Sequence, residues 1–160
     1  HLDSANGDFL FLKKDREINT QPTLCSLSTN TFLFGQPISV PSAKGLIFVE
    51  IDIRPTLLGG LMNILFKTSE LHIQVFLENG KSKDYRIIPG MAKSGFILTP
   101  LVENTKDFET LISKQSLDTL NQVKTLTIAP VAQFWQWNKE FSIEFKDVQF
   151  PNKPGESCAK

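Results

Sequence analysis

The sequence lacks the signatures by which catalytic sites are most readily recognised. It contains no GxSxG motif, no Walker-type phosphate loop, no GxGxxG motif, no HExxH motif and no EF-hand loop. Histidine is scarce, since His72 is the single histidine apart from the first residue. A histidine-rich metal centre is therefore excluded, no cofactor is predicted, and a Ser-His-Asp arrangement would have to use His72.

An excess of charge is also absent, as is any long apolar run. Seventeen basic and seventeen acidic residues give a formal net charge of zero, which argues against a nucleic-acid partner. No segment approaches the roughly 20 apolar residues of a membrane-spanning helix, and the N-terminus shows no signal-peptide pattern. Because the chain begins with His1 rather than Met, we expect a single soluble domain, residues 1–160, excised from a longer protein.

Only two cysteines are present, Cys25 and Cys158, and they lie near opposite ends of the chain. The termini of compact domains often lie close together, so a disulfide between these residues is one expectation. Because it would close a long loop, it would stabilise the fold in the chain-entropy model. The alternative is two unpaired thiols, and no spacing of cysteine and histidine suggests zinc.

What the sequence does contain favours β-structure. Thirteen Phe accompany many Ile, Leu, Val and Thr, which suit a pleated sheet whose one face is buried. The clearest strand pattern is Gly45–Arg54, and Leu71–Val102 reads as a hairpin followed by a further strand. Additional strands are predicted at residues 8–12, 31–34, 38–40, 123–131 and 140–148.

Two segments leave the helix content less certain. Leu57–Thr68 fits a helix or a strand, but Gly59 and Gly60 weaken a helix, so we predict a loop followed by a strand at Leu61–Lys67. Residues 106–114 predict a short helix with Thr105 as its N-cap, and residues 117–120 could add a turn. The fold class is therefore predicted as all-β, a two-sheet antiparallel sandwich of jelly-roll, galactose-binding-like type with one short helix. A closed barrel is the alternative.

Acidic residues alternate with apolar ones on the clearest strand. Glu50, Asp52 and Arg54 share one face, and an acidic pair at this spacing could act as acid and base or bind a cation. A solvated or ion-paired strand face is the interpretation that we favour. A hydrolase using Glu50, Asp52 or Asp84 is therefore the third hypothesis for function, and it requires two carboxyl groups roughly 5 to 10 Å apart across a cleft.

The remaining candidate residues are aromatic or polar. On a strand, Trp135 and Trp137 would point to the same side of the sheet, where they could stack on sugar rings or anchor an interface. Burial in the core is the favoured alternative for this pair. Asp84, Tyr85 and Arg86 lie near the central turn and could hydrogen-bond ligand hydroxyls. These five residues form the predicted ligand-binding set.

The segment YRIIPGMAKSGFILTPLV, residues 85–102, followed by ENTKDF, resembles the soluble C-terminal region of bacterial polytopic inner-membrane proteins of glycosyltransferase-like or uncharacterised type. Those proteins carry a tyrosine-arginine-x-x-proline segment before a glycine-phenylalanine-x-leucine-x-proline-leucine segment. A weaker match extends over Gly45–Phe150. The resemblance implies a sandwich-like domain on the periplasmic face of the inner membrane, attached to transmembrane helices outside this chain. It assigns no catalytic residue, because the membrane part would hold any transferase chemistry.

Together, these patterns predict a non-catalytic extracytoplasmic β-sandwich that binds or positions a carbohydrate or a lipid-linked sugar. The expected partners are a glycan or a neighbouring envelope protein. The alternative is a structural or protein-interaction domain without a small-molecule ligand, which would expose an apolar patch.

Overall fold

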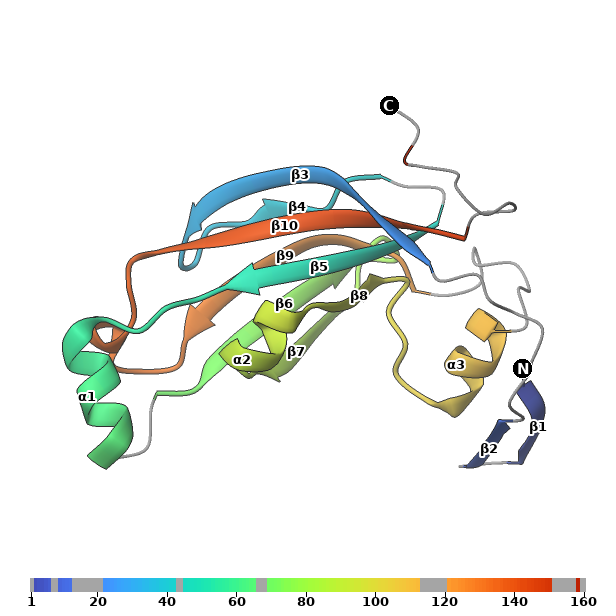
Figure 1. The fold of residues 1–160 in the computed structure, drawn as a ribbon, viewed down its shortest axis with the longest axis horizontal. Coiled ribbons are helices and arrows are strands. Elements are labelled where there is room, and N and C mark those ends of the chain that lie inside the picture. Colours follow the sequence, from blue (N-terminus) through green and yellow to red (C-terminus); the bar gives the residue numbers. More distant parts are fainter. Residues whose placement is uncertain are drawn as a thin grey trace.

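Two antiparallel sheets packed face to face form the body of the computed structural model, which describes residues 2–6, 9–12, 22–42, 45–65, 69–112, 121–150 and 158 (Figure 1). The strands of the first sheet are Thr23–Leu33 (β3), Leu46–Asp52 (β5), Phe96–Thr99 (β8) and Glu140–Gln149 (β10). Those of the second sheet are Ile38–Ser39 (β4), Leu71–Leu77 (β6), Ser82–Ile87 (β7) and Val123–Pro130 (β9). The predicted all-β, two-sheet antiparallel sandwich is confirmed.

The strand order follows from a nested pattern of pairing. β6 pairs with β7, β5 with β8, β4 with β9 and β3 with β10, each time antiparallel. The first sheet therefore has the order β3-β10-β5-β8, and the second has the order β4-β9-β6-β7. The chain from β3 to β10 is thus one long ribbon of paired strands that is folded over itself. β8 is an edge strand of the first sheet, and β7 is an edge strand of the second.

Side chains that alternate along the strands fill the space between the sheets. On β5, Ile47, Val49 and Ile51 are at most 1% exposed, as the alternation of the sequence predicted. The facing core residues include Phe141, Ile143 and Phe145 of β10, Ile73 and Val75 of β6, and Leu126 and Ile128 of β9. Burying an apolar side chain of this size stabilises a fold by about 1.5–3 kcal/mol, so this layer supplies the main stabilisation.

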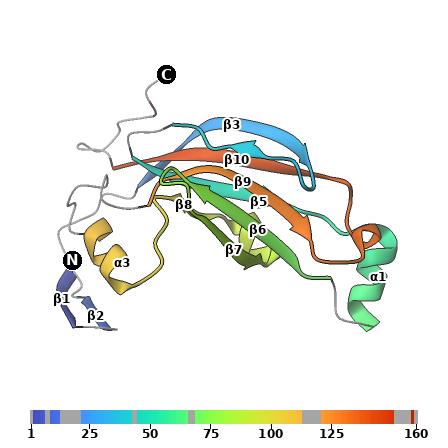
Figure 2. The ribbon, with the colours of Figure 1, turned by 180° about the vertical axis from the view of Figure 1, so that it is seen from behind.

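Helices lie at both ends and along one edge of the sandwich. At one end lie the helix Leu57–Leu65 (α1) and the 3-10 turn Phe134–Gln136 (η2). At the other end lie the helix Thr105–Ile112 (α3) and a hairpin of Leu2–Asn6 (β1) and Phe9–Leu12 (β2), as Figure 2 shows from behind. The helix Pro89–Ser94 (α2) joins β7 to β8, so it crosses from one sheet to the other along the edge.

The strand predicted at Leu61–Lys67 is wrong, because α1 occupies the described part of that segment. The Thr56 hydroxyl accepts the backbone N–H of Gly59 at 3.0 Å and so caps the first turn. A Cβ atom on Gly59 would lie 2.0 Å from the carbonyl oxygen of Gln136. The glycine that argued against a helix is therefore what allows the helix to pack against η2.

The described residues contain three helices, where the sequence predicted one. The predicted helix is α3, but its cap is Asn104 rather than Thr105, because the Asn104 side-chain oxygen accepts the Asp107 N–H at 2.9 Å. The unpredicted α2 begins at Pro89, a residue well suited to the first helical position. The turn suggested at residues 117–120 lies outside the described residues.

Candidate functional site

An apolar groove runs along the edge of the sandwich where β7 and β8 face each other. Its volume is about 440 Å³, which lies within the range of about 300–1,000 Å³ typical of ligand pockets. Its buried floor includes Ile73, Val75, Ile87 and Leu98, and its walls include Ile88, Met91 and Ile97, which are 49%, 68% and 40% exposed. We call this feature the edge groove. Of the residues that line it, only Tyr85 and Arg86 have polar side-chain atoms.

A polar cluster adjoins the edge groove at Tyr85. The Tyr85 hydroxyl of β7 donates to Glu103 at 2.7 Å, and the Lys83 ammonium lies 3.1 Å from the same carboxylate oxygen. Burial, assisted by the hydrogen bond and charge of Glu103, raises the pKa of Tyr85 to about 12. The hydrogen bond from Tyr85 and then the one from Lys83 lower the pKa of Glu103. At neutral pH, Tyr85 is therefore a neutral donor to an ionised carboxylate.

A second cavity of about 360 Å³ adjoins the edge groove at the α1 end of the sandwich. We call it the end pocket. It shares Arg86, Ile87 and Ile88 with the edge groove and is also lined by Ser69, Glu70, Leu71, Pro55, Pro89, Gly90 and Trp137. The Arg86 guanidinium lies 3.9 Å from a Glu70 carboxylate oxygen. The end pocket is therefore the more polar of the two cavities, with a cation and an anion in its wall.

A buried amide fixes the walls of the end pocket. Gln136 is 2% exposed, and its side-chain oxygen accepts the Ser69 N–H at 2.8 Å. Its side-chain nitrogen donates to Gln133, and its backbone carbonyl accepts the Thr56 N–H at 2.9 Å. The next residue, Trp137, is 6% exposed, and its indole N–H is buried without a hydrogen-bond partner. Three separate segments are thus held together around this pocket.

The structure divides the predicted polar set. Tyr85 and Arg86 line the edge groove, and Arg86 also lines the end pocket. Asp84 instead lies on the outer face of β7, where its carboxylate contacts the imidazole Nδ1 of His72 on β6. Asp84 therefore lines neither the edge groove nor the end pocket.

The predicted pairing of the two tryptophans on a strand is wrong. Residues 134–136 form a 3-10 turn, which follows Gln133 in a left-handed conformation with φ of 52°. Trp135 is 52% exposed, whereas Trp137 is 6% exposed and lines the end pocket. The turn replaces the period of two that the prediction assumed, so the two rings do not form a common stacking surface.

The carboxylates of β5 are ion-paired, as the favoured interpretation of their strand face predicted. Asp52 accepts a hydrogen bond from Arg54 at 2.8 Å and lies 3.4 Å from the Lys93 ammonium. The Arg54 hydrogen bond lowers the pKa of Asp52, although burial opposes it. Glu50 accepts a hydrogen bond from Lys146 at 2.6 Å, which raises the pKa of that ammonium. Asp52 is therefore ionised at neutral pH and does not suit the role of a general acid.

Sequence reasoning missed most of the apolar residues of the edge groove and the acidic residue of the end pocket. Met91 and Ile97 gave no periodic signal, and Glu70 lies just before a strand. Within the described ranges, no group of three His, Cys, Asp or Glu side chains could hold a metal ion. In the same part of the chain, each helix is too short or too polar to cross a bilayer.

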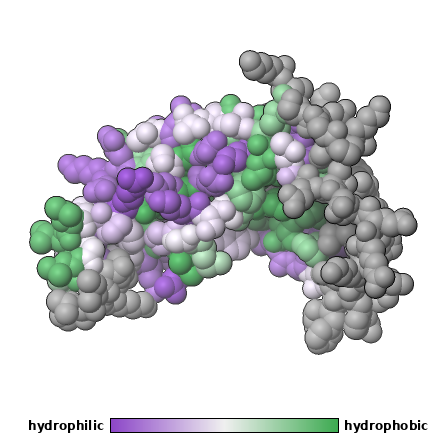
Figure 3. Space-filling model, in the orientation of Figure 1, coloured by the Kyte–Doolittle hydropathy of each residue, from purple (hydrophilic) through white to green (hydrophobic). Residues whose placement is uncertain are grey.

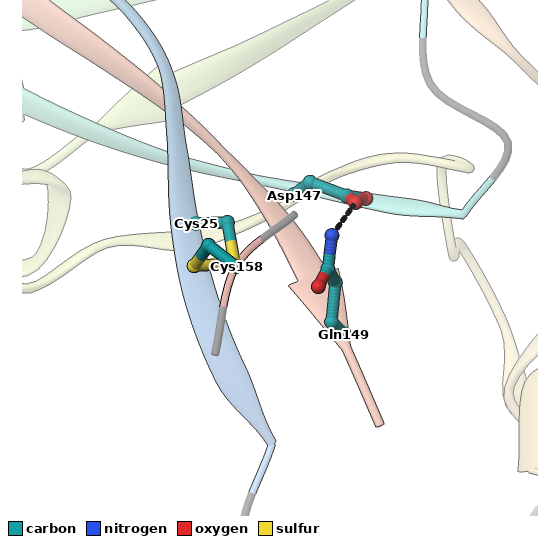
Figure 4. The surroundings of a disulfide bond; sticks show 4 residues. All are labelled: Cys25, Asp147, Gln149 and Cys158. Carbon is teal, nitrogen blue, oxygen red and sulfur yellow. Dashed lines mark hydrogen bonds between the residues drawn. A yellow bond between two sulfur atoms is a disulfide. The ribbon is translucent and has the colours of Figure 1, made fainter. Parts of the chain in front are cut away.

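The two cysteines form a disulfide. Cys25 of β3 and Cys158 are bonded, with 5.6 Å between their Cα atoms (Figure 4). Beside the bridge, Gln149 donates to Asp147 at 3.0 Å on β10, the strand that pairs with β3. The C-terminal Cys158 is therefore attached to the first sheet, at an edge away from both cavities.

Comparisons with protein-family models, with curated proteins and with solved structures find no match to this chain. The resemblance of residues 85–108 to bacterial envelope proteins therefore stays a prediction.

Proposed function

We propose that this chain is a non-catalytic binding module that holds an amphipathic ligand of the lipid-linked sugar class by its apolar part. The edge groove is the observation that carries this proposal. A cavity of about 440 Å³ whose lining has polar side-chain atoms only at Tyr85 and Arg86 suits a hydrocarbon chain. A purely polar ligand would lose its hydration there without gaining hydrogen bonds.

The groove and the sequence resemblance involve the same residues. All lining residues of the edge groove except Ile73 and Val75 belong to residues 85–102. This supports our proposal that the domain belongs to a membrane protein and acts on its periplasmic face. The disulfide between Cys25 and Cys158 further supports an oxidising compartment.

The strand order supports assignment to the jelly-roll type. Jelly rolls are eight-stranded double sheets in which a long ribbon of paired strands is wrapped over itself. The nested pairs from β3–β10 to β6–β7 have this arrangement. In this topology β7 and β8 end their sheets side by side, which is where the edge groove opens.

The test uses the neutral apolar fluorophore N-phenyl-1-naphthylamine, which has no sugar or charged group. We expect saturable binding with enhanced fluorescence at one site per chain. Ile97→Asp places a charge in the groove wall and should weaken binding at least about tenfold. Val131→Asp is the matched control, because Val131 is 64% exposed and outside both cavities. Non-saturable binding, or equal binding by both variants, would refute the proposal.

The alternative function, protein interaction without a small ligand, is favoured by one other observation. Apolar side chains are exposed at the end formed by α1 and η2, where Figure 3 shows a hydrophobic area over α1. The residues concerned are Leu57, Leu58, Leu61, Phe134 and Trp135, which are 52–97% exposed. If this surface binds a neighbouring envelope protein, Leu57→Asp should abolish its association with that protein, while Ile97→Asp should leave it unchanged.

A further inference from the structure

We infer that the end pocket is the head-group site for the same ligand and that it binds an uncharged saccharide. This inference rests on the proposed function, because it assigns the polar part of a molecule whose tail occupies the edge groove. It adds where the sugar is held, that the group held there is uncharged, and which residues distinguish it from other lipid head groups.

The two cavities are arranged to hold one amphipathic molecule. They share a wall of three consecutive residues, Arg86, Ile87 and Ile88, at the junction of β7 and α2. On one side of this wall the lining is hydrocarbon apart from Tyr85, and on the other it includes Glu70 and Trp137. A ligand lying across the wall would therefore pass from an apolar to a polar environment over the length of three residues.

The charged groups of the end pocket select for hydroxyls. Glu70 is a hydrogen-bond acceptor and Arg86 is a donor, and a sugar hydroxyl can both donate and accept. Their closest atoms are 3.9 Å apart, which is longer than a direct hydrogen bond, and the Arg86 side chain is 57% exposed. Arg86 thus has N–H groups available to a ligand. A phosphate would be attracted by Arg86 but repelled by Glu70, and a quaternary ammonium the reverse, so this pair offers neither group a net attraction, whereas a hydroxyl can bond to both residues.

Trp137 provides a second, independent indication of a ligand. It is one of the residues that line the end pocket, it is 94% buried, and its indole N–H has no hydrogen-bond partner. Buried donors are nearly always paired, because an unpaired one loses its hydration without compensation. A ligand oxygen that reaches the indole would satisfy this donor, and saccharides offer such oxygens while remaining uncharged.

The experiment compares alkyl chains of equal length that differ only in head group. Dodecyl maltoside, dodecylphosphocholine and dodecanoate, each below its critical micelle concentration, are titrated against bound N-phenyl-1-naphthylamine. We expect dodecyl maltoside to displace the fluorophore at a concentration about tenfold lower than the other two compounds require. A tenfold difference is about the effect of one hydrogen bond to a charged group. Arg86→Met and Glu70→Gln should each reduce this preference to about twofold. Lys93→Met is the control, because Lys93 lies on α2 outside both cavities and should leave the preference unchanged.

The outcomes separate this inference from the proposed function. Fluorophore binding that is retained in Arg86→Met and Glu70→Gln shows that these variants are folded and that the edge groove is intact. If the fluorophore binds but the three head groups compete equally, the end pocket is not a saccharide site and the inference fails alone. If the unsubstituted chain does not bind the fluorophore, the proposed function fails and the inference fails with it.

Discussion

The polar cluster at the edge groove can be tested through the ionisation of one phenol. Tyr85 is the single tyrosine of the chain, so absorbance near 295 nm during an alkaline titration reports on this residue alone. Burial and the Glu103 carboxylate hold its pKa at about 12 in the folded protein, against about 10 for an exposed phenol. We expect a midpoint near 12 in the native protein and near 10 in urea.

The same shift predicts how stability depends on pH. The pKa of Tyr85 is raised on folding, so its contribution to stability is fully present below pH 10 and is lost as the pH rises toward 12. Two pKa units correspond to about 2.7 kcal/mol, and because Tyr85 is 36% exposed we reduce this figure to about 1–2 kcal/mol. Urea unfolding at several pH values between 9 and 12 would measure the loss.

Glu103→Gln separates the causes of the shift. It removes the carboxylate charge but leaves the partial desolvation of Tyr85, which is the largest cause of the shift. The midpoint should therefore fall below that of the native protein and remain above that of the urea-unfolded chain. Glu140→Gln, an exposed substitution on β10, is the control and should not move it. The absorbance is recorded immediately after a stopped-flow pH jump, and circular dichroism verifies that the protein is still folded at that time. A native midpoint equal to that in urea would refute the assignment of Tyr85 as a partly desolvated donor to Glu103.

Two further predictions concern the framework. Replacing Cys25 and Cys158 by serine opens a loop of 133 residues. In the chain-entropy model this should reduce the free energy of unfolding by about 5 kcal/mol. Urea denaturation measures the change, and equal midpoints for the two proteins would contradict the prediction. Gly59→Ala should destabilise, because its Cβ would lie 2.0 Å from a backbone carbonyl, whereas Gly60→Ala, with no atom within 4 Å, should be neutral or stabilising by up to about 1 kcal/mol. Thermal unfolding of the two alanine variants gives the comparison, and equal melting temperatures would count against the packing of α1 on η2.

The sheets could be predicted from the sequence because their signal is local. In β5, in β6 and in the first half of β10 every second residue is apolar, and this period of two identifies both the strand and its buried face without knowledge of the partner strand. Pairing order is not local. The nested pattern depends on which strands meet after the chain folds, so two sheets could be expected from the sequence but not the order β3-β10-β5-β8.

The helices and cavities were predicted less well because contacts distant in sequence decide them. α1 forms although its segment contains Gly59 and Gly60. Thr56, just before the helix, is held by hydrogen bonds to the carbonyl oxygen of Gln136, which is about 80 residues away in the sequence. Tyr85 and Arg86 were chosen as polar residues near a turn, and the structure brings both to the edge groove. The apolar wall of that groove was missed, because an exposed apolar residue cannot be told from a buried one by residue type alone.

The apolar wall of the edge groove is also a reason for proposing a binding role. Ile88, Met91 and Ile97 are 40–68% exposed, so they gain much less from burial than the core residues of β5 do. Polar side chains at these positions would leave the packing between the sheets unchanged and would reduce the risk of aggregation. All three face one cavity beside the edge strands, where exposed apolar surface is most hazardous. Stability alone does not account for such a wall, and this is why we propose that an apolar ligand covers it.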